Sequence, residues 1–195
     1  MNRIITTLTT TADFSDDGKK RYLLKKIWDE KKPTLAIIML VPSEASGIEL
    51  DSTTLLVLNN ASRLGYGSVS IVNLFATLGD FKLEKSEKTD KENCDAILQV
   101  AKDSDVIVYA AGVGKLSNKK FIERQKQTLE VLKPYEKKMR CLSDKEGNSR
   151  FQHPLSPAVR TWYLSEMRID EIIKDEEPKQ KKITSTKNKK KLSSS

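Results

Sequence analysis

Residues 34–40 read TLAIIML, an apolar run that follows the turn-like DEKKP and ends shortly before Pro42. A strand with one face in water alternates apolar with polar residues, whereas this run is apolar at almost every position. It therefore predicts a strand that is covered on both faces. Such strands lie in the middle of parallel sheets, so the run predicts an α/β fold.

Strand-like and helix-like segments alternate along the chain on the C-terminal side of this run. Further strands are expected at 68–76, 105–112 and 137–143, and helices at 53–65, 89–105 and 118–133. Because each strand is followed by a helix, consecutive strands should run parallel with helices packed on the sheet. The pattern predicts a three-layer α/β/α sandwich around a mainly parallel four-stranded sheet.

Two segments outside this alternation also have a predicted structure. Residues 19–32 combine apolar residues that suit a strand face with a Lys content that suits a helix, and we favour a strand that pairs with residues 34–40. Residues 158–174 have the pattern of a final amphipathic helix. A chain of 195 residues is too short for two comfortable domains, so we expect a single α/β domain over residues 1–175.

The net charge of +8 is unevenly distributed, because residues 179–195 contain seven Lys and no acidic residue. Residues 176–195 have almost nothing apolar to bury and are expected to form a disordered, Lys-rich tail. One interpretation is an arm that holds nucleic-acid phosphates; the other is an ordinary solvated terminus. The candidate phosphate-binding residues are Lys179, Lys181, Lys182, Lys187, Lys189, Lys190 and Lys191.

Composition argues against several classes of protein. No stretch approaches the roughly 18 to 20 apolar residues of a membrane span, and the N-terminus lacks the pattern of a secretion signal, so we expect a cytoplasmic protein without membrane contact. The chain has one His and two widely spaced Cys, which argues against a zinc site or a disulfide framework. The Walker spacing is absent around Gly112, which argues against a nucleoside triphosphate site. We expect no metal and no cofactor.

Chemistry is expected where the parallel strands end, because loops and helix N-termini converge at that edge of a sheet. Four of the expected strand ends carry candidate residues, namely Pro42 and Ser43, Asn73 and Phe75, Gly112, and His153. Asp51 precedes a helix, where a capping role competes with a substrate contact. A lone His is more often structural than catalytic, but the flanking prolines of His153 favour a functional loop.

The motifs IIMLVPSEA, DSTT, GYGSVSIVNLFAT, ENCD, VYAAGVG and HPL follow one another in this chain. Their order and spacing resemble those of the bacterial and phage domain-of-unknown-function family 1643, over roughly residues 20 to 157. More distantly, the layout is similar to that of the uracil-DNA glycosylase superfamily. That similarity implies a uracil-DNA-glycosylase-like fold and a protein that recognises a nucleobase in single-stranded or modified DNA, with excision of the base as a further expectation.

The superfamily resemblance also implies roles for individual residues. Asn73 would bond to the edge of a flipped base, and His153 would stabilise negative charge on the departing base. Pro42 and Ser43 would line the pocket floor, and Leu155 would wedge into the strand. Fixed hydrogen-bond donors suit this reaction, since breaking an N-glycosidic bond places negative charge on the base and needs no metal.

One residue departs from the resemblance. Val41 stands where the superfamily usually has an acid or amide that orients the attacking water, and Val can neither donate nor accept a hydrogen bond. Glu44 and Asp51 are the nearest alternatives for a general base. Two further hypotheses therefore stay open: a catalytically silent module that binds a nucleobase, nucleotide or protein partner, and a hydrolase of free nucleosides.

Overall fold

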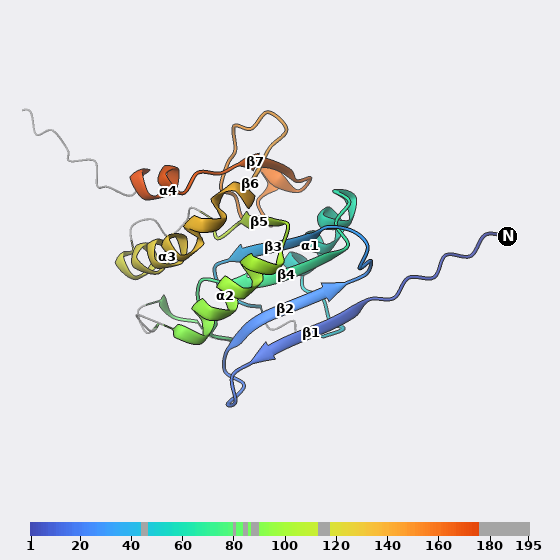
Figure 1. Cartoon of the computed structure of the whole chain (residues 1–195), viewed down its shortest axis with the longest axis horizontal. Coiled ribbons are helices and arrows are strands. Elements are labelled where there is room, and N and C mark those ends of the chain that lie inside the picture. The colour runs from blue at the N-terminus through green and yellow to red at the C-terminus, as the bar shows by residue number, and fades with distance from the viewer. Residues whose placement is uncertain (44–46, 80, 84–85, 87–89, 113–117, 176–195) are drawn as a thin grey trace, which may run out of the picture.

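The computed structural model describes residues 1–43, 47–79, 81–83, 86, 90–112 and 118–175. These residues form one seven-stranded mixed sheet with the strand order β1-β2-β4-β3-β5-β6-β7 (Figure 1). Its strands are β1 (Thr9–Phe14), β2 (Arg21–Ile27), β3 (Thr34–Met39), β4 (Ser68–Asn73), β5 (Val106–Tyr109), β6 (Met139–Ser143) and β7 (Tyr163–Glu166). The predicted disordered tail lies outside the described residues.

The four strands expected from the sequence are β3, β4, β5 and β6, and they form the parallel middle of the sheet. The prediction of a mainly parallel four-stranded sheet is nevertheless wrong. β2 pairs antiparallel with β4, β1 with β2, and β7 with β6, so three antiparallel pairs flank three parallel ones. The chain is α/β, as expected, but its sheet is larger and mixed.

Helices cover both faces of the sheet. α1 (Ser52–Arg63) packs on one face through Val57, in a core cluster that also contains Ile37, Ile71 and Trp162. α2 (Lys91–Asp103), α3 (Lys119–Leu132) and α4 (Ile169–Asp175) pack on the other face with a second cluster. Two 3-10 segments, η2 (Lys133–Lys138) and η3 (Pro157–Val159), complete the described secondary structure. In the part of the chain that is described, no helix is both long and apolar enough to cross a membrane.

The segment 19–32 forms a strand as predicted, but its predicted partner is wrong. β2 pairs with β4 and β1 rather than β3, because both edges of β3 are already occupied by β4 and β5. The link from β2 to β3 crosses the start of β4, where Trp28 and Asp29 both donate to the Gly67 carbonyl oxygen. A Cβ atom at Gly67 would lie 1.8 Å from the Asp29 carbonyl oxygen, so only glycine allows this crossing.

The predicted helix at 158–174 is also wrong. This segment contains η3, β7 and the short helix α4 instead. Trp162 is fully buried and its backbone is held by α1, since its amide donates to Asn60 Oδ1 and its carbonyl accepts from Arg63. Docking of this extended turn on α1 overrides the helical pattern of the sequence and lets β7 pair with β6.

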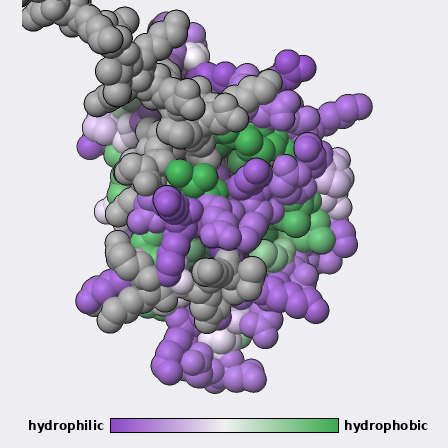
Figure 2. Space-filling view, turned by 90° about the vertical axis from the view of Figure 1, so that its left-hand side faces the viewer, coloured by the Kyte–Doolittle hydropathy of each residue, from purple (hydrophilic) through white to green (hydrophobic). Residues whose placement is uncertain are grey.

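The connections at the centre of the sheet diverge between β3 and β5. The chain leaves β3 through α1 toward β4 on one side, and leaves β5 through α3 toward β6 on the other. Ligands of open α/β sheets bind at such a switch point, outside the carboxyl ends of the strands. This edge lies on the left of Figure 1, and Figure 2 views it directly, with hydrophilic side chains surrounding small hydrophobic patches.

Candidate functional site

The loop that follows β3 brings three of the predicted residues to the switch point. Pro42 is buried, Ser43 is half-buried, and Asp51 is the N-cap of α1. Asp51 Oδ1 accepts a 2.6 Å hydrogen bond from the Thr54 amide, while Oδ2 is buried and has no hydrogen-bond partner among the described residues. The capping role expected for Asp51 is therefore present, and one carboxylate oxygen remains for another contact.

The environment of Asp51 favours its charged form. Burial raises the pKa of Asp51, but the nearby Ser43 hydroxyl and the Thr54 backbone amide outweigh this effect, so the pKa is lowered overall. The Ser43 hydroxyl lies close enough to the carboxylate to lower its pKa, although no described donor meets hydrogen-bond geometry at Oδ2. Asp51 is consequently ionised at neutral pH.

Two buried cations from β2 lie under this loop, and sequence reasoning missed both. Arg21 Nη1 donates to the Ser43 carbonyl oxygen at 3.0 Å, and Lys26 Nζ donates to the Gly47 carbonyl oxygen at 2.7 Å. Each side chain is only 1% exposed, and burial lowers the pKa of both. The many Lys residues around them in the sequence suggest a solvent-exposed segment, so no pattern in the local sequence identifies Arg21 and Lys26 as buried.

Asn73 ends β4 and points to the face of the sheet that α1 covers, because side chains alternate along a strand and Val69 and Ile71 belong to the α1-face cluster. It is 1% exposed, and its Nδ2 is buried with no hydrogen-bond partner in the described residues. Buried amide donors in proteins are almost always paired, so this one can donate to a ligand or a water.

Asn93 of α2 fixes the backbone at the end of β4. Its Nδ2 donates to the carbonyl oxygens of Asn73 and Leu74 at 2.9 and 3.2 Å. Asn93 is fully buried, and the N-cap of its helix, Asp90, accepts a 3.1 Å hydrogen bond from the Asn93 amide. The sequence motif ENCD contains Asn93, but its positioning role depends on a contact that only the fold creates.

His153 approaches Gly112, in the segment that follows β5. An ideal Cβ on Gly112 would lie 3.7 Å from His153 Cβ, and Gly112 has a left-handed φ of 78° that favours glycine. His153 Nδ1 accepts a hydrogen bond from the Leu155 amide at 3.2 Å. In the neutral ring this contact assigns the proton to Nε2, which is left to donate.

Asp51 and His153 are electrostatically coupled. Burial lowers the pKa of His153, and the charge of Asp51 opposes this effect. The same carboxylate also acts on Arg21. Ser43, Asp51, Gly112 and His153 are thus brought together from three loops, with Arg21 beneath them.

Phe75 and Val41 lie apart from this group, whereas Leu155 adjoins it. Phe75 belongs to the core on the α2 and α3 face, 5.1 Å from the Phe81 ring centroid and 5.3 Å from Arg124. Val41 also packs against that core. Leu155 is 47% exposed beside His153. The seven Lys predicted to contact phosphate lie outside the described residues.

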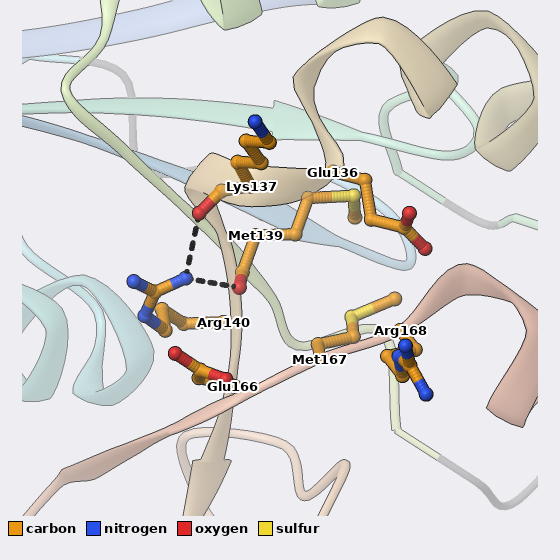
Figure 3. Close-up of a pocket in the computed structure, with 7 residues that line it drawn as sticks. All are labelled: Glu136, Lys137, Met139, Arg140, Glu166, Met167 and Arg168. Atoms are coloured by element: carbon orange, nitrogen blue, oxygen red, sulfur yellow. Dashed lines mark hydrogen bonds between the residues drawn. The ribbon is translucent and has the colours of Figure 1, made fainter.

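Three cavities lined by described residues contain none of Ser43, Asp51 and His153. One of about 330 Å³ lies where β6 begins, between η2 and the end of β7, and is lined by charged residues and two methionines (Figure 3). There Arg140 donates to the carbonyl oxygens of Lys137 and Met139. This is the amino edge of the parallel strands, opposite the candidate site. Within the described ranges, no three His, Cys, Asp or Glu side chains gather to hold a metal ion.

A model for the family described as protein of unknown function, DUF1643, matches residues 21–155. The chain belongs to this family. The DUF1643 span begins at Arg21 and ends at Leu155, so it contains the parallel strands and every described residue of the candidate site, and leaves out β1, β7 and α4. The family resemblance seen in the sequence is confirmed. No curated protein matches the chain.

Proposed function

We propose that this DUF1643 protein binds a nucleobase of DNA at the carboxyl edge of its sheet and hydrolyses the N-glycosidic bond, in the manner of the uracil-DNA glycosylase superfamily. The observation that carries the proposal is the buried Asn73 Nδ2 at the end of β4, a fixed hydrogen-bond donor without a protein partner in the described residues. A flipped base offers acceptor atoms on its Watson–Crick edge that such a donor can read.

The contacts of His153 suit the departure of the base in this reaction. When the bond between C1′ and the base nitrogen breaks, its electron pair leaves with the base. Nε2 of His153 is the ring atom free to donate to the base oxygen that receives this charge. A preorganised donor of this kind contributes about 3 to 4 kcal/mol in related oxyanion sites, without proton transfer.

The tested reaction is base release from DNA. Single- and double-stranded oligonucleotides containing uracil or hydroxymethyluracil are incubated with the protein, and free base is quantified by mass spectrometry. We expect release that falls by about 10²- to 10³-fold in His153→Ala, as for loss of one oxyanion donor. Gln152→Ala is the matched control, because Gln152 is the sequence neighbour of His153 and its amide donates to the Arg150 carbonyl rather than to the proposed site.

A catalytically silent base-binding module is the second candidate, and Val41 favours it. Val41, in the loop after β3, stands where a water-orienting group is expected, but it is apolar and packs against the core on the opposite face from Asn73. Binding of these oligonucleotides without release of any base would support this candidate and contradict the proposed hydrolysis. Absence of both binding and release would contradict both.

The Lys-rich residues 179–195 are proposed to bind additional phosphates. Removing them should weaken DNA binding and flatten the dependence of log Kd on log salt concentration, with a slope change of roughly 0.7 to 0.9 for each phosphate that the segment neutralises. Fluorescence anisotropy of labelled oligonucleotides at several salt concentrations measures both quantities. Equal affinity and slope in the truncated and full-length chains would contradict a DNA role for this segment.

A further inference from the structure

In the described part of the chain, three helices begin at the carboxyl edge of the sheet, and two of them, α1 and α2, are capped by an aspartate, whereas Asn118 caps α3. Asp90 caps α2 and Asp51 caps α1. In Asp90 both oxygens are occupied: Oδ1 accepts from the Asn93 amide at 3.1 Å, and Oδ2 lies 3.1 Å from Lys20 Nζ. In Asp51 only Oδ1 is occupied, by the Thr54 amide at 2.6 Å. The two caps therefore differ at the second carboxylate oxygen, which is paired in Asp90 and unpaired among the described residues in Asp51.

The free oxygen of Asp51 is a buried acceptor that needs a donor. Oδ2 has no hydrogen-bond partner in the described residues, and leaving a buried charged acceptor unpaired costs more than about 1 to 3 kcal/mol. Ordered water commonly fills such positions. Asn73 provides an independent indication of a ligand at this edge, because its Nδ2 is likewise buried and unpartnered.

The charges around Asp51 come from two other elements. The negative charge of Asp51 raises the pKa of Arg21 on β2 and of His153 in the loop after β6, against the effect of burial. Ser43, in the same loop as Asp51, lowers the pKa of Asp51. Asp51 is thus held as a carboxylate whose charge acts on the imidazole proposed to stabilise the departing base. By contrast, Val41 has no atom that could bind water.

We infer that Asp51 binds the attacking water through Oδ2 and takes its proton, supplying the group that Val41 lacks. This inference rests on the proposed hydrolysis. The water O–H bond breaks with its proton going to Oδ2, the water oxygen forms the bond to C1′, and the bond between C1′ and the base breaks with its electron pair leaving on the base. A weak base suffices, because glycosidic cleavage passes through an oxocarbenium-like sugar that water attacks readily.

The test separates binding from hydrolysis with three proteins: wild type, Asp51→Asn and Asp90→Asn. Asn caps helices as well as Asp does, so both variants keep their caps. We expect Asp51→Asn to bind the uracil oligonucleotide within about threefold of wild type by anisotropy. Its rate of base release should fall by about 10²- to 10⁴-fold, the usual contribution of a general base. Asp90→Asn should release base at nearly the wild-type rate.

The pH profile provides a readout that a structural role for Asp51 would not move. The wild-type rate should fall at acidic pH as Asp51 is protonated, and this limb should be missing in Asp51→Asn. Wild-type rates with an intact acidic limb in Asp51→Asn would overturn the assignment of Asp51 alone. Equal loss of release in Asp51→Asn and Asp90→Asn would also overturn it, by showing a general effect of the caps. A wild type that releases no base would overturn the proposed hydrolysis itself.

Discussion

Asn60 joins α1, which Asp51 caps, to the segment that follows His153. Its replacement therefore gives a clear stability prediction. It is 5% exposed on α1, the helix that Asp51 caps. Its Oδ1 accepts from the Trp162 amide at 2.9 Å, and its Nδ2 donates to the carbonyl oxygens of Leu56 and Arg160 at 2.9 and 3.0 Å. One side chain therefore ties α1 to the segment that follows His153.

The expected destabilisation can be worked out from these bonds. In Asn60→Ala the Trp162 amide stays buried without an acceptor, which costs about 1 to 3 kcal/mol, and removal of the bond to the Arg160 carbonyl costs roughly 1 kcal/mol more. Asn59 is exposed on the same helix, so Asn59→Ala has the same gain in helix propensity without these penalties. Asn60→Ala should be less stable than Asn59→Ala by about 2 to 4 kcal/mol.

Urea unfolding followed by tryptophan fluorescence measures this difference. With a urea m-value of roughly 2 kcal/mol/M, the midpoint of Asn60→Ala should lie about 1 to 2 M below that of Asn59→Ala. Midpoints within about 0.3 M of each other, at equal m-values, would refute the reasoning. They would mean that water or a rearranged loop replaces the hydrogen bonds of Asn60 at little cost.

Two further predictions concern His153 and the glycine it approaches. Gly112→Ala should lower the free energy of unfolding by about 1 to 2 kcal/mol, because φ is 78° at Gly112. Gly47→Ala should change the free energy of unfolding little, because Gly47 has an ordinary φ and nothing lies within 4 Å of its ideal Cβ. Urea unfolding of both variants measures the difference. Burial lowers the pKa of His153 in the folded protein below its ordinary value of 6.5. As the pH falls through 6.5, the unfolded chain therefore binds a proton at His153 before the folded protein does, and the folded protein loses stability until the pH reaches the lowered pKa. Wild type should accordingly lose more stability between pH 7.5 and 5.5 than His153→Gln, and equal losses in the two proteins would contradict a lowered pKa.

The middle of the fold could be predicted from the sequence because its strands are apolar on both faces. Leu35 to Ile38 are each at most 1% exposed, so the continuous apolar run and the burial agree. The outer strands carry no such signal. Thr9–Phe14 and Tyr163–Glu166 lie at the two edges of the sheet, where exposed and partly exposed residues dominate and pairing depends on a neighbour far away in sequence.

The candidate site was predictable in part for a similar reason. Residues at the ends of apolar strands, such as Asn73, could be found by locating the strands. Arg21 could not, because a cation that donates to a backbone carbonyl 22 residues away leaves no local pattern. The end of the expected strand at 68–76 predicts that Phe75 shares the site with Asn73, yet the ring of Phe75 lies in the core on the opposite face.

The apolar Val41 and the unpaired oxygen of Asp51 are two features of one loop. An acid directly after β3 would have to be accommodated where Val41 packs against the core on the α2 and α3 face. Burying an unpaired charge in such a cluster is costly. An acid at the cap of α1 is instead supported by the helix N-terminus and by the Thr54 amide, which together favour its ionised form. The fold can therefore keep a carboxylate at this edge at lower cost from position 51 than from position 41.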